Sequence, residues 1–312
     1  MVILSIVGSF SAITGIIFGA SVLTISGPLL GELFATMAPI FRKKDLKVVS
    51  ELGIRYEEVE FPTDRGIILR GWYFPSNLPD SPAILYAPAT ARDQRSGVSL
   101  VKPLHEAGYS VLLFSYRGHG ESDGNKIGFT YGAEESKDVD AAIKYLNETK
   151  GLNQIGAIGH SAGAVSIILS AARNEKIGAV VAASAFQSIE EIWTTNKPKF
   201  FPKFLFELTL KLSERRKGFS RNDVRPKDVI SKITPRPILL IHGSKDKRIT
   251  KEQALNLFKK ANSPKKLWMI DGVSHSGVRD PGLDHLVREV IVFFDSAFRK
   301  TGNPTNLFYI SS

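Results

Sequence analysis

The sequence predicts an α/β fold in which helices cover a mainly parallel β-sheet. Short apolar runs of the kind that form parallel strands buried on both faces recur along the chain. Stretches with helical periodicity separate these runs. No repeat or low-complexity linker interrupts the alternation from about residue 46 onward. Residues 46–312 are therefore expected to form one folded domain.

The elements are expected in the following order. Residues 56–61 and 67–74 flank a turn sequence, Pro-Thr-Asp-Arg-Gly, and predict a β-hairpin. Further strands are expected at residues 83–86, 110–114, 155–158, 177–183, 237–241 and 266–270. Helices are expected at residues 97–107, 133–149, 162–172, 251–261 and 283–299. This order predicts strand–helix–strand units with parallel strands.

The composition excludes several classes of protein. A chain of 312 residues with 43% hydrophobic residues can bury a large core. The absence of cysteine excludes disulfides, thiolate metal sites and a cysteine nucleophile. No metal-ligand cluster with suitable spacing is evident, so neither a metal nor an organic cofactor is expected. The 41 Lys and Arg against 31 Asp and Glu give a net charge of +10, whose location then matters.

The N-terminal segment is the most hydrophobic part of the chain. Residues 1–31 carry no charged side chain, and residues 2–26 form a 25-residue run broken only by Ser, Thr and Gly. As a helix this run would extend ~37 Å, more than a ~30 Å hydrocarbon core. Residues 1–45 are therefore expected to be a hydrophobic anchor and a basic linker. A cleaved signal peptide and a buried helix remain as alternatives, although no basic residue precedes the run.

The charges beside this run predict a membrane orientation. Arg42, Lys43, Lys44 and Lys47 follow it, and nothing basic precedes it. The positive-inside rule then places the rest of the chain in the cytoplasm, as a single-pass membrane-anchored protein.

One segment, at about residues 190–228, interrupts the alternation and is expected to form a small helical cap. Between Trp193 and Lys227, ten basic residues stand against Glu207, Glu214 and Asp223, a net charge of +7. The segment also carries Phe200, Phe201, Phe204, Leu205, Phe206, Leu208, Leu210 and Leu212. Two interpretations remain open: a cap that touches an anionic bilayer, or a helix that buries its apolar stripe and solvates its basic face. Nucleic acid is not an expected partner, since no recognisable binding motif accompanies the charge.

A candidate nucleophile lies in Gly159-His160-Ser161-Ala162-Gly163, which matches the pattern GxSxG. An apolar strand, IGAI, precedes the motif, and a helix-forming stretch, AVSIILSAA, follows it. A sharp strand-to-helix turn exposes a serine oxygen above a sheet, and side chains at the two glycines would collide across such a turn. Ser161 is therefore the predicted nucleophile.

Serine needs a base and the base needs an orienting carboxylate, in the chain order Ser, Asp, His for this kind of turn. Asp246 follows the strand at 237–241, and His275 follows the strand at 266–270. These two are the predicted carboxylate and base. The weaker candidates are Asp271 and Asp223 for the acid, and His160, His242, His105 and His285 for the base. Of these, His242 is expected to brace the Asp246 loop.

Residues 56–294 resemble the α/β-hydrolase superfamily, in particular its serine-esterase and lipase-like branch. The resemblance is carried by the GHSAG turn and by the sequences FSYRGHGES at 114–122, DVDAA at 138–142, IHGSKD at 241–246 and DGVSH at 271–275. It implies an eight-stranded sheet with one antiparallel member, and hydrolysis of esters or related acyl compounds.

The resemblance also implies an oxyanion hole made by two backbone N–H groups. One is expected from Ala162, the residue after the nucleophile. The other follows an HG pair in such families, and here Ala87-Pro88 replaces that pair, so the donor position falls on Ala89. Arg117 and Glu121 in the YRGHGES loop are expected to brace that loop, with contact to substrate as the alternative role.

Together these features predict a membrane-anchored serine hydrolase. It would cleave carboxylic esters through a Ser-His-Asp triad and an acyl-enzyme, acting on lipid-like acyl substrates at a membrane. A peptidase or a thioesterase would use the same triad, so both remain alternatives. From a different class, a non-catalytic membrane-bound binding protein remains as well, because the Ala-Pro pair departs from the family pattern. The oligomeric state is not predicted.

Overall fold

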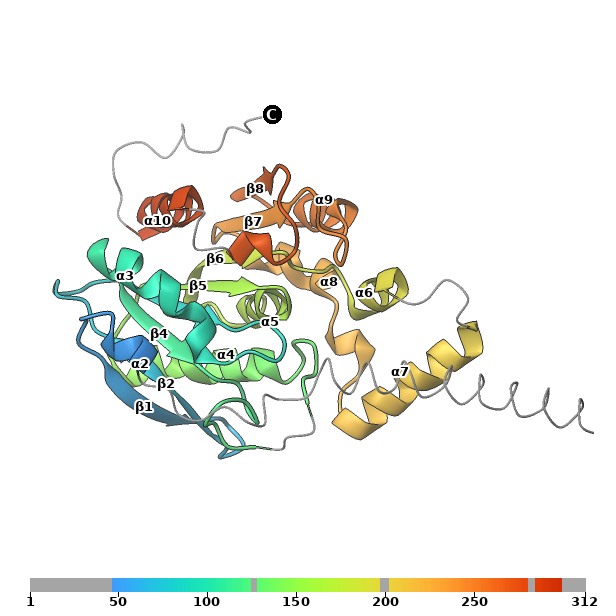
Figure 1. Ribbon diagram of the computed structural model, residues 1–312, viewed down its shortest axis with the longest axis horizontal. Helices are drawn as coiled ribbons and strands as arrows, with labels where there is room; N and C mark the ends of the chain where they lie inside the picture. Colours follow the sequence, from blue (N-terminus) through green and yellow to red (C-terminus); the bar gives the residue numbers. More distant parts are fainter. Residues whose placement is uncertain (1–46, 125–127, 197–201, 280–283, 299–312) are drawn as a thin grey trace, which may run out of the picture.

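An eight-stranded β-sheet forms the centre of the molecule (Figure 1). The computed structural model describes residues 47–124, 128–196, 202–279 and 284–298. The strands are β1 (Glu57–Pro62), β2 (Ile68–Phe74), β3 (Ala83–Ala87), β4 (Ser110–Phe114), β5 (Ile155–His160), β6 (Ile177–Ala183), β7 (Ile238–Gly243) and β8 (Lys265–Ile270). Their order across the sheet is β1-β2-β4-β3-β5-β6-β7-β8.

Strand directions agree with the implied topology. β2 runs antiparallel to both of its neighbours, β1 and β4, and every other pair in the sheet is parallel. The turn between β1 and β2 is closed by Thr63, whose N–H donates to the carbonyl of Ile67 at 2.9 Å. The predicted hairpin and the eight-stranded sheet with one antiparallel member are therefore confirmed.

Helices cover both faces of this sheet, which explains why its central strands are mainly apolar. All residues of β3, β4 and β5 are buried. Alternate side chains of β3 enter two separate cores, Leu85 on one face and Ile84 on the other. The first core contains buried residues of α4 (Glu135–Lys144), α5 (Ala162–Ala171) and α9 (Lys251–Lys260), and the second contains residues of α3 (Val98–Glu106) and α10 (Asp284–Phe298).

The predicted helices occur where expected, with small differences at their ends. The stretch predicted as one helix at 133–149 is α4 followed by a π-helical turn, Tyr145–Thr149. Lys150 N–H donates back to the carbonyl of Tyr145 at 3.1 Å, which closes this wider turn. A short helix, α2 (Lys47–Ser50), precedes the sheet.

The cap lies between β6 and β7. It contains α6 (Ile189–Asn196), α7 (Lys203–Lys217), a 3₁₀ turn η3 (Arg221–Asp223) and α8 (Pro226–Val229). Figure 1 shows α7 projecting from the body of the molecule. On α7, Leu210 is buried, whereas the side chains of Phe204, Leu208 and Leu212 are exposed. The interpretation in which this helix buries its apolar stripe is therefore wrong for those three residues.

The predicted anchor at residues 1–45 lies outside the described residues, so it stays a prediction, as does the division of the chain at that point. Among the residues that the structure describes, no helix combines the length and the apolar character needed to cross a membrane.

Candidate active site

Ser161 lies on a sharp turn between β5 and α5. The strand ends at His160 and the helix begins at Ala162, so Ser161 alone makes the turn. Its backbone has φ 56° and ψ −122°, a conformation that is strained for a residue with a side chain. Its N–H donates to the carbonyl of Ala183 on β6 at 2.8 Å, which ties the turn to the next strand. The predicted strand–turn–helix context is confirmed.

The two motif glycines are required by close backbone contacts. A Cβ on Gly159 would lie 2.6 Å from the carbonyl carbon and oxygen of Gly163. A Cβ on Gly163 would lie 2.3 Å from the carbonyl oxygen of Ala87 and 2.4 Å from that of Pro88. The first turn of α5 therefore packs directly against the end of β3 and the loop that follows it.

Asp246 and His275 complete a chain of hydrogen bonds with Ser161. His275 Nε2 lies 3.2 Å from Ser161 Oγ, and His275 Nδ1 lies 2.6 Å from Asp246 Oδ2. The other carboxylate oxygen, Oδ1, accepts from the N–H groups of Arg248 and Ile249, each at 2.9 Å. The three side chains come from the ends of β5, β7 and β8, so the parallel strands bring them to one edge of the sheet.

The environment of Asp246 determines which atoms donate and which accept in the hydrogen bonds between Asp246, His275 and Ser161. Burial alone would raise the pKa of this fully buried carboxyl. The hydrogen bonds from His275 and from the N–H groups of Ile249 and Arg248 more than offset burial and lower the pKa below its ordinary value. An ionised carboxylate only accepts, so His275 Nδ1 must carry a proton. Nε2 is then free to accept the proton of the Ser161 hydroxyl.

Two further histidines support the loops of this site. His242 Nε2 donates to the carbonyl of Ile249 at 2.9 Å, and burial lowers the pKa of His242, which favours its neutral form. The expectation that His242 braces the Asp246 loop is confirmed. His160 Nε2 donates to the carbonyl of His275 at 2.9 Å. The sequence does not predict this second contact, because no local spacing relates residues 115 positions apart.

The other acidic residues and histidines considered for the acid and the base make contacts away from Ser161. Asp271 accepts from the hydroxyl of Ser244 at 2.8 Å, and Asp223 accepts from the N–H of Ser220 at 3.1 Å. His105 donates to the carbonyl of Pro75, and His285 packs edge-on against Trp268. None of these four is joined to Ser161 by a hydrogen bond within the described ranges.

The two expected oxyanion donors lie on segments that touch. Ala162 is the first residue of α5, and Ala89 follows β3 by two residues and is buried. Neither N–H has a hydrogen-bond partner among the described residues. Ala89 is held by its carbonyl, which accepts from the N–H of Arg92 at 3.1 Å. Their roles as oxyanion donors stay a prediction, and both backbone groups are available for it.

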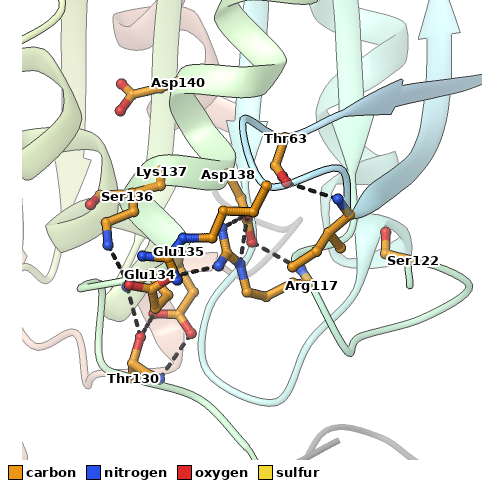
Figure 2. A network of polar contacts seen from close by, with 12 residues as sticks. Thr63, Arg117, Ser122, Thr130, Glu134, Glu135, Ser136, Lys137, Asp138 and Asp140 are labelled. Carbon is orange, nitrogen blue, oxygen red and sulfur yellow. Dashed lines mark hydrogen bonds and ion pairs between the residues drawn. The ribbon is translucent and has the colours of Figure 1, made fainter. Parts of the chain in front are cut away.

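The loop after β4 is braced by a buried ionic network (Figure 2). Arg117 donates to Asp138 from its backbone N–H at 2.9 Å, from Nε at 2.9 Å and from Nη2 at 2.7 Å. Its Nη1 lies 2.5 Å from Glu134. Glu121 is exposed, and its carbonyl accepts from Arg70 at 2.7 Å. The expectation that Arg117 braces the loop is confirmed, and Glu121 contributes through its backbone.

Replacing Asp138 by asparagine is expected to lower the free energy of unfolding by about 3 kcal/mol, because Arg117 would keep its buried charge without the carboxylate charge that balances it. Burial raises the pKa of Asp138 to about 6, so the comparison belongs at pH 8, where the carboxylate is ionised. Urea unfolding of both proteins measures the difference. Asp140→Asn on the same helix is the matched control, since Asp140 pairs with the half-exposed Arg173 and should cost less than about 1 kcal/mol. Equal losses in the two variants would contradict a special role for the buried pair.

An open hollow of about 770 Å³ lies at the opposite edge of the sheet from Ser161. Its lining residues, Asp140, Arg173, Asn174, Glu175 and Lys176, come from α4 and from the segment just before β6 begins. Arg173 and Asp140 pair across it at 2.6 Å. The hollow is therefore separate from the site around Ser161.

Comparison with known proteins identifies relatives along most of the chain. The family model described as prolyl oligopeptidase family matches residues 97–301. The uncharacterized protein Rv2307c of Mycobacterium tuberculosis is 30% identical over 229 residues, covering 72% of this chain and 73% of that protein. Protein bem46 of Schizosaccharomyces pombe is 26% identical, covering 75% of each chain.

Solved structures share the fold. The Pyrococcus furiosus esterase Pf2001 superposes with a TM-score of 0.68 at 22% identity, covering 84% of this chain and 99% of that one. Est1E from Butyrivibrio proteoclasticus, solved with ferulic acid bound, gives a TM-score of 0.59 at 22% identity, covering 76% and 96%. The sheet order and these superpositions show the α/β-hydrolase fold, and the family match, which spans about two thirds of the sequence, shows that the chain belongs to the prolyl oligopeptidase family.

Proposed function

We propose that the protein hydrolyses carboxylic esters through a triad of Ser161, His275 and Asp246. The observation that carries this proposal is the continuous hydrogen-bonded chain from Ser161 Oγ through His275 to Asp246, at 3.2 Å and 2.6 Å. A serine hydroxyl is a weak nucleophile unless a base within hydrogen-bond reach takes its proton. This geometry supports His275 as the base and Asp246 as the carboxylate that orients it.

The reaction would proceed in two acyl transfers. Ser161 Oγ attacks the ester carbonyl while His275 Nε2 takes its proton. The tetrahedral intermediate collapses, the leaving alcohol receives that proton, and the acyl group stays on Ser161. Water then attacks the acyl-enzyme with His275 again as base, which releases the acid and restores the serine. Asp246 holds the imidazole in place and stabilises its positive charge at each step.

Negative charge on the carbonyl oxygen would be stabilised by the N–H groups of Ala162 and Ala89. A single such donor contributes about 3–4 kcal/mol to the stability of the transition state. Replacement of the HG pair by Ala87-Pro88 does not remove the donor, because only Pro88 lacks an N–H and the donor lies one residue further on.

We further propose lipid-like acyl substrates taken from a membrane. The exposed apolar residues of the cap and the uncharged run at residues 2–26 support this substrate class. The basic residues after that run support a single-pass anchor with the catalytic domain in the cytoplasm. The family match supports a second candidate, a peptidase, since the same triad cleaves amides when the pocket accepts them.

A substrate panel tests the proposal. p-Nitrophenyl esters of increasing chain length should be hydrolysed, with an optimum beyond acetate, and faster than acyl thioesters or aminoacyl anilides. A preference for the anilides would instead establish the peptidase. Ser161 should also be labelled by a fluorophosphonate probe. No labelling together with no turnover of any substrate would overturn the proposal and leave a binding protein.

Gly243 provides a test of the His275 loop. A Cβ at this position would lie 2.3 Å from the carbonyl oxygen of Val273, two residues before His275. Gly243→Ala is therefore expected to displace His275 and to lower kcat for p-nitrophenyl acetate by about 100-fold, as a misplacement near 1 Å does. Gly272→Ala is the matched control, because its Cβ would meet no atom within 4 Å. Its positive φ should reduce stability by ~1–2 kcal/mol with little change in kcat, and equal kcat in the two variants would contradict the prediction.

A further inference from the structure

The outward side of α7 carries three large apolar side chains. Phe204 is 72% exposed, Leu208 is 49% exposed and Leu212 is 42% exposed. They are spaced four residues apart, so they share one side of the helix. An exposed stripe of this kind marks an interaction surface, because folding alone would favour its burial.

The same side of α7 is cationic. Lys211, Arg215 and Arg216 are exposed, and each lies three or four residues from Leu208 or Leu212. Within the described ranges, none of these three cations forms an ion pair. We call these six residues, Phe204, Leu208, Lys211, Leu212, Arg215 and Arg216, the outward face of α7.

The acidic residues of α7 lie beside this face and tie the helix to the rest of the cap. Glu207 and Glu214 both pair with Arg221 of η3, at 3.0 Å and 2.9 Å. Leu210 and Ser213 are buried on that inner side. Arg221 therefore holds the helix through these two carboxylates, and the outward face itself contains three cations and three apolar groups, with Glu207 at its border.

The cap is attached at the edge of the sheet that carries the candidate triad. β6 ends at Ala183, whose carbonyl binds the N–H of Ser161, and α6 begins six residues later. Trp193 of α6 packs against Tyr131 of the main domain, with ring centroids 5.7 Å apart. α7 then follows as the outermost helix of the cap (Figure 1).

We propose that the outward face of α7 docks the protein on an anionic phospholipid bilayer. Phe204, Leu208 and Leu212 would enter the boundary between headgroups and acyl chains, with the three cations against lipid phosphates and carboxylates. Charge complementarity selects this partner: a helix that is apolar and basic on one side lies in the plane of an anionic interface. A second copy is disfavoured, because a symmetric contact would bring like charges together. The inference deepens the proposed function, since it names the surface from which lipid-like substrate would be taken.

The absence of cysteine allows one position to be labelled at a time in the full chain. Leu212→Cys carries an environment-sensitive nitrobenzoxadiazole label, in a Ser161→Ala background so that no lipid is hydrolysed. Leu78→Cys is the matched control, since Leu78 is also exposed (59%) but lies in the loop that enters β3, at the far edge of the sheet. Both proteins keep the N-terminal run, so insertion of that run cannot distinguish them.

Phosphatidylcholine vesicles containing phosphatidylserine should raise the emission at Leu212→Cys and allow its quenching by lipid-borne quenchers, with no change at Leu78→Cys. Each cation near an anionic surface strengthens binding on the order of fivefold, so Lys211→Gln, Arg215→Gln and Arg216→Gln together should weaken docking of α7 on the order of 100-fold, measured as loss of the emission change at Leu212→Cys. A signal that depends on protein concentration without vesicles would overturn the proposal in favour of self-association. High emission of the label at Leu212→Cys in buffer, before vesicles are added, would overturn it as well. So would emission that does not change when vesicles are added. Because binding is read without turnover, failure of docking and failure of the esterase proposal are distinguishable.

Discussion

Replacing Ser161 by alanine is expected to lower kcat for p-nitrophenyl ester hydrolysis by about 10⁶-fold, the loss seen when a triad nucleophile is removed. The remaining rate would come from substrate binding and the oxyanion donors alone, since no other hydroxyl hydrogen-bonds to His275 Nε2 among the described residues. The measurement is turnover of the short-chain ester by both purified proteins, with matched thermal unfolding.

Ser170→Ala is the control for this experiment. Ser170 lies on the same helix, is buried, and donates to Asp140 at 2.5 Å, away from the triad. Its loss should reduce stability slightly and leave the rate unchanged. Turnover by Ser161→Ala at the wild-type rate would show that another group attacks the ester, and it would contradict the assignment of Ser161 as nucleophile.

Asp246→Asn is expected to lower kcat by about 10⁴-fold with little effect on folding. The N–H groups of Arg248 and Ile249 both point at Oδ1, so the asparagine oxygen would stay there and its NH₂ would face His275. An NH₂ group donates, which forces the imidazole proton onto Nε2. His275 could then no longer accept from Ser161.

Two readouts separate this tautomer effect from a general disturbance. Labelling by the fluorophosphonate should slow in parallel with kcat, while KM changes little. Asp271→Asn is the control, because Asp271 accepts from Ser244 outside the triad. An equal loss in both variants would indicate damage to the loops instead of a changed proton position.

Much of the fold and site follows from local sequence. The central strands are buried on both faces, so most of their residues are apolar, and this makes them recognisable. The strand ends then locate Ser161, Asp246 and His275, since parallel strands present their carboxyl ends at one edge. Local sequence patterns are sufficient to predict where these three residues lie, because each of them directly follows a strand that can be recognised from its own sequence.

Other features depend on partners distant in the chain. The Phe and Leu spacing of α7 is the same whether the stripe is buried or exposed, and only its attachment through Arg221 decides which side faces outward. The bond from His160 to the carbonyl of His275 likewise depends on how two strands are arranged. The sequence predicts ordinary helix at the π-helical turn Tyr145–Thr149. One extra residue in a turn hardly changes the spacing of apolar residues along the sequence, so the pattern does not reveal it.

The contact of Gly163 with the carbonyls of Ala87 and Pro88 sets the spacing of the two candidate oxyanion donors by atomic size. Steric contact neither titrates nor weakens in salt, so this spacing should remain constant as pH and ionic strength change. Both donors also belong to the main chain, where exchange of a side chain leaves them in place. Alanine substitution of neighbouring side chains would therefore leave both donors in place, whereas a Cβ at Gly163 would push the two segments apart and proline at position 89 would remove the N–H there.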